Sequence, residues 1–476
     1  MLFNSYTFWL FFAVVVTIYF FLRHRGQNLL LLIASYVFYG FWDWRFLFLL
    51  FFTTCADFSA GLLISKLGGR KRKLVLLSSI SISLSLLGFF KYFNFFAHEL
   101  TEFLGQLGLN ISSPALHIIL PVGISFYTFQ SMSYAIDVYR GHTPAVRNLL
   151  DFALYVSFFP QLVAGPIERS SHLVPQIVNP RRKRYDDFRE GLYHVLIGLF
   201  KKVVIADNMA FFVGAVFQTP TYELTALDCL MGVYAFAFQI YGDFSGYSSI
   251  AQGVARWLGF DLMFNFRHPY FATSPSDFWK RWHISLSSWL RDYLYIPLGG
   301  NRGGQFKMYR NLLLTMVIGG IWHGANWTFI AWGILHGLLL CGHRFIARNA
   351  PAAAVEKNPA VVSMSLARVG KMFVMFNFIC LGWLFFRAES IHQAGVMLGT
   401  FFGPWRVTEF SVFTLASMAF YILPLLGYEW WVEKKDDLLA LTKCKWPIRA
   451  AVYIYLVLMM FFFPSPVQNE FIYFQF

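Results

Sequence analysis

Apolar runs long enough to cross a lipid bilayer recur along the whole chain, and this feature restricts its possible folds most strongly. The chain is 57% hydrophobic and only 13% charged, and its 56 phenylalanines are too many for a water-facing surface. Lipid admits only helices or closed barrels, because backbone polar groups there must bond to one another. The runs lack the alternation of barrel strands. The sequence therefore predicts an all-α, polytopic membrane protein.

The basic residues lie mostly in short loops between the apolar runs, which is how membrane orientation is encoded. Residues 23–25, 66–73 and 181–184 are assigned to the cytoplasmic side on this rule. The assignment gives about eleven crossings and places both termini outside. The formal charge of +14 is thus spread over loops. Because no soluble basic domain gathers that charge, nucleic acid is not expected as a partner.

The segment Leu149–Val163 has basic residues on both flanks and therefore cannot cross once. It is either re-entrant or packed at the inner interface, and the two prolines and the glycine in and just after it supply the break that a re-entrant path needs. The segment from Arg256 to Arg310 contains no run of spanning length and many basic residues, so it is assigned to the cytoplasmic side. There, Ser274 and Pro275 predict the start of one amphipathic helix that continues to Pro297 as an interfacial or re-entrant helix.

His323 lies within a long apolar run, from about Asn311 to Leu340, that contains no acidic residue. Basic residues on both sides predict that this run is a hairpin. About 20 Å of helix separates His323 from Arg310, which puts the histidine beyond the midplane of a core of about 30 Å. Neighbouring glycines would let another helix or a substrate come close. An ionisable ring at this depth is either a functional group or a bridge between helices.

Gln239, Asp243 and Tyr247 are spaced four residues apart and share one face of a predicted helix. A carboxylate at that depth must face a cavity or a partner. Asp243 is therefore either a structural clamp or a substrate contact.

The histidines define the chemistry that we expect. His283, from the inner side, and His323 can meet only if the membrane is hollowed between them. Histidine can act as a general base on a hydroxyl or thiol. The chain has no nucleophile elbow, phosphate-binding loop or His-Glu-x-x-His zinc motif, and its five cysteines form no metal pattern. This absence favours transfer between two bound substrates. Arg291 and other inner arginines would suit an anionic donor, or they serve topology and lipid headgroups.

Several motifs together resemble the membrane-bound O-acyltransferase family, and within it the bacterial branch that acetylates alginate and other extracellular polysaccharides. The same branch includes peptidoglycan O-acetylation proteins and teichoic acid D-alanylation proteins. The motifs are Asp277–Ser287, Trp289–Arg302, Ile321–Thr328, Leu120–Tyr127, Ala164–Ile167 and Tyr241–Tyr247. The resemblance covers nearly the whole chain.

The resemblance implies that His323 is the essential histidine and His283 the second, inner one. It implies a ring of about eleven helices around a central funnel. The candidate residues that line the funnel are Gln239, Asp243, Trp282, Arg291 and Asn326. A single integral membrane domain is expected, with peripheral helices in 1–110, a catalytic core in 115–345 and C-terminal helices in 371–476.

The resemblance further implies that the chain is a bacterial inner membrane protein and that acetyl-CoA, arriving from the cytosol, is the acetyl donor. No tightly bound cofactor and no metal are expected. The acetyl group would reach an extracytoplasmic polysaccharide, such as an alginate-like polymer or peptidoglycan, through a periplasmic SGNH-type acetyltransferase. The tail Phe471–Phe476 is a candidate contact for that partner. The alternatives are D-alanyl transfer to teichoic acid, a non-enzymatic polysaccharide exporter, and a scaffold that recruits secreted enzymes.

Overall fold

The computed structural model describes residues 1–109, 118–163, 165–182, 184–220, 223–349, 365–466 and 470–472. These residues form helices and connecting segments without a strand. The chain divides into two compact units. Unit 1 comprises Met1–Gly191 with Ala251–Met263, and unit 2 comprises Leu192–Ile250 with Phe264–Phe476. The predicted all-α class is confirmed, whereas the predicted division into peripheral, core and C-terminal helices stays a prediction.

Within the described residues, five helices are long and apolar enough to span a membrane. They are α3 (Phe46–Lys66), α4 (Gly69–Gln106), α15 (Trp327–Asn349), α16 (Leu366–Arg387) and α18 (Glu409–Lys435). Two shorter apolar helices are α1 (Tyr6–Phe21) and α19 (Trp446–Phe462). These helices make the chain a multi-pass membrane protein, while the number of about eleven crossings and the orientation of the termini stay predictions.

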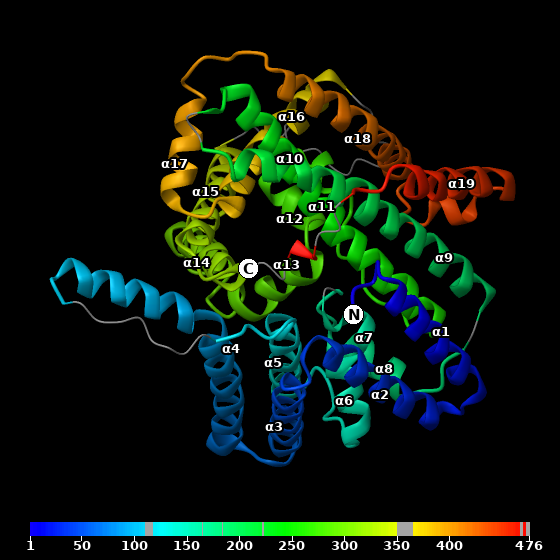
Figure 1. The fold of residues 1–476 in the computed structure, drawn as a ribbon. Coiled ribbons are helices and arrows are strands. Elements are labelled where there is room, and N and C mark those ends of the chain that lie inside the picture. Colours follow the sequence, from blue (N-terminus) through cyan, green and yellow to red (C-terminus); the bar gives the residue numbers. More distant parts are fainter. Residues whose placement is uncertain are drawn as a thin grey trace. The chain divides into compact units, whose positions relative to one another are not determined.

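Unit 1 packs α3, α4 and α5 (Ile124–Arg140) against one another, as Figure 1 shows. Its other helices are α1, α2 (His24–Asp43), α6 (Leu149–Ser157), α7 (Phe159–Leu162) and α8 (Ser170–Val178). The nine residues of α6 reach about 13 Å, less than half of the bilayer core. The helix is interrupted at Phe158, and α7, which follows, has only four residues. This interrupted path agrees with the expectation that the segment does not cross once.

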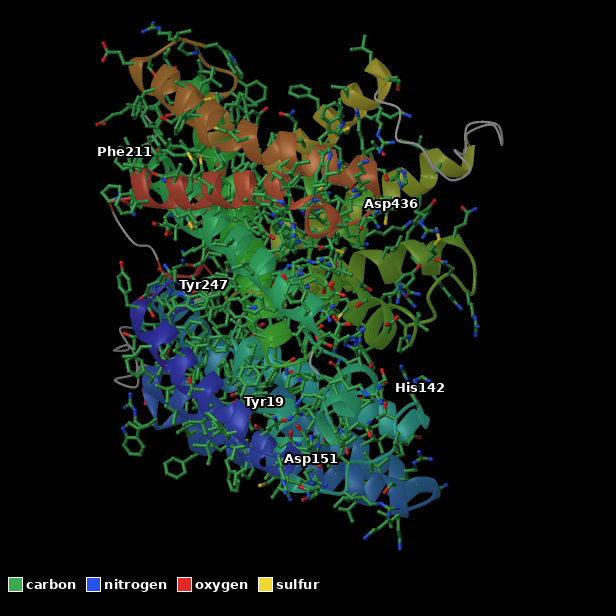
Figure 2. The ribbon with its side chains drawn as sticks, turned by 90° about the vertical axis from the view of Figure 1, so that its right-hand side faces the viewer. Tyr19, His142, Asp151, Phe211, Tyr247 and Asp436 are labelled. Carbon is green, nitrogen blue, oxygen red and sulfur yellow. The ribbon has the colours of Figure 1, made fainter. Side chains whose placement is uncertain are left out.

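A polar network joins helices of unit 1, and two of its residues, Tyr19 and Asp151, are labelled in Figure 2. The buried carboxylate of Asp151 accepts hydrogen bonds from Arg25, at 2.8 Å, and from Asn28. Arg181 donates hydrogen bonds to the hydroxyl of Tyr19, at 2.8 Å, and to the side-chain oxygen of Asn28, also at 2.8 Å. A buried carboxylate is tolerated only when it is paired in this way. The network therefore fixes α1, α2 and α6 to one another.

Unit 2 contains the segments that carry the two histidines. Its remaining helices are α10 (Asp207–Phe217), α12 (Pro275–Arg281), α13 (Ile284–Leu290), α14 (Gln305–His323) and α17 (Ile391–Thr400). A π-helical segment, Phe200–Ala206, precedes α10, and a second one, Arg291–Tyr295, follows α13. Two helices, α9 (Tyr185–Leu199) and α11 (Ala226–Trp257), contribute residues to both units.

The single amphipathic helix predicted from Ser274 to Pro297 is wrong. Its start is confirmed, because the Ser274 hydroxyl accepts a hydrogen bond from the Asp277 amide at 3.2 Å. The helix then stops at Arg281, and a new one begins at Ile284. Between them His283 has φ +43°, in the left-handed region that interrupts a helix and that few residues other than glycine adopt.

The predicted hairpin of α14 and α15 is present, and glycine makes its close packing possible (Figure 1). A Cβ atom added to Gly333 would lie 2.6 Å from the backbone oxygen of Met316. At Gly320 the corresponding distance to the Phe329 oxygen is 2.3 Å. Neither contact can be relieved by a side-chain rotation, because both oxygens belong to helix backbone. The two helices therefore approach one another only because these positions lack side chains.

We predict that Gly333→Ala destabilises the protein by roughly 1–3 kcal/mol, because the helices must separate to admit the methyl group. The matched control is Gly342→Ala in the same helix, where an added Cβ meets nothing within 4 Å. Thermal unfolding of the purified protein in detergent measures the effect. Gly342→Ala should keep or slightly raise the melting temperature, since alanine favours helix. Equal melting temperatures for both variants would contradict the packing argument.

Candidate active site

His323 is the last residue of α14, and its side chain is 4% exposed. Its ring contacts Trp322, Trp332 and Phe386, with centroids 5.0, 5.0 and 5.2 Å away. The three aromatic rings come from α14, α15 and α16, so the imidazole is enclosed at the meeting point of three helices. Such a shell excludes bulk water and lowers the local dielectric constant.

Asn326 fixes the turn that follows His323. Its side-chain oxygen accepts a hydrogen bond from the Thr328 amide at 3.0 Å, which satisfies the start of α15. Its amide group donates to the backbone oxygen of Glu389, 2.8 Å away and just past the end of α16. The contacts of Asn326 thus hold the ends of α14, α15 and α16 together around His323. Its predicted place in the lining of a funnel stays a prediction.

His283 is fully buried, and Asn265 determines its orientation. The Nδ1 atom of His283 lies 3.1 Å from Oδ1 of Asn265. That oxygen also accepts a bond from the Ser285 hydroxyl at 2.9 Å, while the Asn265 amide group donates to Ser248. A carbonyl oxygen can only accept, so Nδ1 carries the proton and Nε2 keeps its lone pair.

His283 lies between two short helices, outside the helices long enough to span a membrane. Burial lowers the pKa of His283 to about 3, because the protonated ring would lose its hydration without gaining a carboxylate. The ring is therefore neutral at physiological pH. In this form it can accept a proton or a hydrogen bond at Nε2.

The two histidines that the sequence analysis identified as candidates both lie beside the ring of Trp322. The ring of Trp322 lies 5.0 Å from that of His323 and 6.2 Å from that of His283. Both imidazoles thus belong to one constellation, although 40 positions separate them in sequence. The hollow between the histidines that the sequence analysis required stays a prediction.

Trp282 belongs to a buried aromatic cluster that extends toward His323. Its ring is 4.8 Å from Trp383 and stacks on Phe278 at 5.7 Å. Trp383 in turn lies 6.5 Å from Trp332, which contacts His323. Trp282 is only 1% exposed, so it supports the wall of the site. Its predicted contact with a substrate stays a prediction.

The inner arginines have different environments. Arg281 is paired with Glu433 on α18, at 2.8 Å, and with Asp277, at 2.7 Å. It therefore fixes the end of α12 immediately before Trp282 and His283. The side chain of Arg291 is 63% exposed and bonds to its neighbour Asp292 at 2.7 Å. The interpretation of Arg291 as a donor contact stays a prediction.

Asp243 is held in a buried ion cluster. The ammonium group of Lys202 lies 2.9 Å from Asp243 and 2.9 Å from Asp207. The other oxygen of Asp243 accepts a hydrogen bond from the amide of Ile472 at 2.6 Å. Two carboxylates and one ammonium thus satisfy one another away from water. Of the two roles left open for Asp243, these contacts favour the structural clamp.

The end of the chain packs against α11. Phe471 lies 4.3 Å from the ring of Tyr247, which is labelled in Figure 2, and Ile472 binds Asp243. Both residues are at most 1% exposed. The expectation that the tail contacts a partner is wrong for these two residues, because their side chains are buried in unit 2. Residues 473–476 of that predicted contact lie outside the described residues, as does Ala164 of the Ala164–Ile167 motif.

Gln239 lines a polar cavity of about 680 Å³ in unit 2. The wall is formed by α10, α11, the end of α16 and the segment after α19, and Phe211, labelled in Figure 2, belongs to it. The side-chain oxygen of Gln239 is buried and has no hydrogen-bond partner within the part of the chain that the structure describes. A buried acceptor without a partner is costly. The predicted contact of Gln239 with a substrate stays a prediction.

Asn265 and Glu433 contribute to the surroundings of His283 but were not identified from the sequence. Glu433 has a sequence signal, because it follows Glu429 by four residues in an apolar helix and both must face partners. Asn265 has no such sequence signal, because it lies in an irregular segment without a helical or strand pattern.

Taken together, these contacts describe a dry aromatic site with two imidazoles, one of them in a defined tautomer, and a separate polar cavity. Imidazole bases in such a setting suit proton transfer during group transfer between two bound molecules.

Comparisons with known proteins agree with this chemistry. The sequence model of the membrane-bound O-acyltransferase family matches residues 142–386, about half of the chain. A probable alginate O-acetylase of Pseudomonas aeruginosa is 44% identical over 418 residues, which cover 86% of this chain and 77% of that protein. A peptidoglycan O-acetyltransferase of Helicobacter pylori is 40% identical, over 79% of this chain and 75% of that protein.

A teichoic acid D-alanyltransferase of Bacillus subtilis is more distant, at 26% identity over 62% of this chain and 77% of that protein. The family match covers both histidines and the helices that enclose them. The chain therefore belongs to the membrane-bound O-acyltransferase family and is an acyltransferase.

Proposed function

We propose that the protein transfers the acetyl group of acetyl-CoA, which binds from the cytosolic side, toward hydroxyl groups of an extracytoplasmic polysaccharide. An alginate-like polymer or peptidoglycan is the proposed acceptor, in keeping with the names of the relatives that are 40–44% identical. We propose the bacterial inner membrane as its location and a periplasmic SGNH-type acetyltransferase as the partner that receives or directs the acetyl group.

One observation carries this proposal: two buried imidazoles contact the same indole inside an aromatic shell. In the proposed reaction, neutral His323 removes the proton of the acceptor hydroxyl. The oxygen then attacks the thioester carbonyl, and the carbon–sulfur bond breaks. The imidazolium of His323 returns the proton to the departing thiolate. An ester and free CoA result, so atoms and charge balance without a metal or a redox partner.

His283 acts from the inner side in this proposal. Its Nε2 accepts a hydrogen bond, because Asn265 keeps the proton on Nδ1. The aromatic wall keeps water from the thioester, which would otherwise be hydrolysed.

D-alanyl transfer is the alternative acyl chemistry. The D-alanyltransferase relatives are 26% identical, compared with 40–44% for the acetyl-transferring ones. This difference favours acetyl. Family membership argues against a purely non-enzymatic exporter or scaffold.

We predict that His323→Ala lowers acetyl transfer from acetyl-CoA by at least a hundredfold while the protein still inserts in the membrane. The measurement is release of CoA and labelling of an acceptor polysaccharide by the purified protein. His142→Ala, a control at an exposed histidine in unit 1, should keep full activity. Normal acetylation by the His323→Ala variant would remove His323 from the mechanism, and labelling from an activated D-alanyl donor alone would select the alternative.

We further predict that Asn265→Ala lowers kcat by about 10–100-fold, the size expected when the partner that orients an essential imidazole is lost. Asn265→Asp keeps the acceptor oxygen and should restore much of the rate. Its added negative charge favours protonated His283, so the pKa of that ring rises and the acid limb of the pH–rate profile moves to higher pH. If the Asp variant were as impaired as the Ala variant, with an unchanged pH profile, Asn265 would not position the histidine.

A further inference from the structure

A groove of about 620 Å³ in unit 2 is lined by the start of α12 and by two membrane-spanning helices, α15 and α16. The volume lies within the range of about 300–1,000 Å³ that is typical of sites for small molecules. None of the aromatic residues that enclose His323 lines this groove. The groove is therefore separate from the candidate active site, and it shares no residue with the polar cavity beside Gln239.

The lining of the groove changes from apolar to polar along both spanning helices. Leu335 and Phe378 line one part, whereas His343 lies eight residues after Leu335 and Lys371 lies seven residues before Phe378. These intervals correspond to about 11 Å of helix. In the described part of the chain α15 and α16 are consecutive spanning helices that pack against each other, so the end of the first and the start of the second lie on one side of the membrane. The groove thus has an apolar end within the membrane and a polar end near its surface.

Positive charge gathers at the polar end of the groove. Lys371 is exposed and carries the only formal charge among the described residues of the wall, with histidine counted as neutral. It forms no ion pair with an acid in the described part of the chain. Arg344 directly follows the wall residue His343, and Arg368 lies one turn before Lys371 on α16. The polar end therefore offers cations to an anionic ligand.

Two glycines leave open space in the wall. Gly342 of α15 and Gly370 of α16 both line the groove, and a Cβ atom added to either one would meet nothing within 4 Å. At Gly333 of α15, in contrast, the backbone of α14 occupies the space where a side chain would lie. No described residue occupies the space beside Gly342 and Gly370 in this way. This space can accept an apolar chain that comes from the bilayer.

The groove is open toward the lipid. Leu338 and Val374 line it on the spanning helices, and each of these apolar side chains is more than half exposed. Exposed apolar surface on such helices faces acyl chains and not water. A lysine beside it can lay its methylene groups on the apolar wall while its ammonium group stays among the lipid headgroups. By the rule that basic residues mark the inner side, the polar end lies at the cytoplasmic leaflet, where anionic lipids attract such groups.

From this arrangement we infer that the groove binds an anionic glycerophospholipid of the cytoplasmic leaflet. One acyl chain lies beside Gly342 and Gly370, and the phosphate group of the lipid binds Lys371. A free phosphate compound would use only the polar end, so the apolar length of the groove selects the lipid. The inference concerns lipid binding alone and does not depend on the proposed acetyl transfer.

Native mass spectrometry of the purified full-length protein in detergent tests the selection of the headgroup. The protein is mixed with equal amounts of dioleoyl phosphatidylglycerol and dioleoyl phosphatidylcholine, which have the same acyl chains. The wild-type protein should retain the anionic lipid about fivefold more, the ratio expected for one lysine near a membrane surface. Lys371→Gln should lose this preference. Lys445→Gln, which removes an exposed lysine of unit 2 outside the groove, should keep it.

A second pair of variants tests the place of the acyl chain. Gly342→Phe fills the open space in the wall and should lower the retention of both lipids at least threefold, because the ring occupies the position of the chain. The matched control is Gly427→Phe in the spanning helix α18, where an added Cβ also meets nothing within 4 Å and which lies outside the groove. This control should retain lipid as the wild-type protein does.

Equal retention of the two lipids by the wild-type protein, or a preference that survives Lys371→Gln, overturns the inference. Retention of lipid by Gly342→Phe at the level of Gly427→Phe overturns it as well. Displacement of phosphatidylglycerol by an excess of CoA would assign the groove to the cytosolic donor. Displacement by glycerol phosphate at the concentration of the lipid would show that the acyl chain contributes nothing. Either displacement contradicts a lipid site.

Discussion

The cost of burying charge governs the arrangement of unit 2. Lys202 sits between Asp207 and Asp243, and Lys201 lies 2.8 Å from Glu429. Burial costs each of these ions several kcal/mol of hydration, and the attraction of its partner offsets that cost. The pairs connect helices that are distant in sequence, since Glu429 belongs to α18. The requirement that buried charges be neutralised thus determines which helices can be neighbours.

His283 satisfies the same constraint by remaining neutral. His283 is completely buried and is held by an amide oxygen, so its proton stays on one nitrogen and the other keeps a basic lone pair. A carboxylate in the place of Asn265 would favour the imidazolium and raise the pKa of the ring, so a smaller fraction of it would be neutral at a given pH. Arg281 and Glu433 neutralise one another next to this site and keep their charges from acting on it unopposed. The chemistry therefore depends on pairing around the site as much as on the imidazoles themselves.

The sequence was most informative where local patterns decide the structure. Apolar runs predicted the helices, basic residues on both flanks predicted the hairpin, and the glycines around His323 predicted that another helix or a substrate can come close. These signals are readable because each acts over a few residues. The break at His283 was not predictable, since its left-handed backbone is supported by Asn265, 18 residues earlier. The same holds for Asp243, whose partner Lys202 lies 41 positions away in sequence. A local pattern could not distinguish a structural clamp from a substrate contact for Asp243. The long-range contact with Lys202 is the evidence that favours the clamp.

The aromatic shell and the polar cavity are two unlike environments in unit 2, and the two substrates of the proposed reaction differ in the same way. A thioester is best protected in a dry site, where the rings of Trp322, Trp332 and Phe386 exclude water from His323. A sugar chain needs hydrogen bonds along its whole length, and these are supplied only where polar atoms line the wall. Phe386 belongs to the aromatic shell, and the next residue, Arg387, belongs to the wall of the cavity. Two neighbouring residues of α16 thus contribute to two different environments.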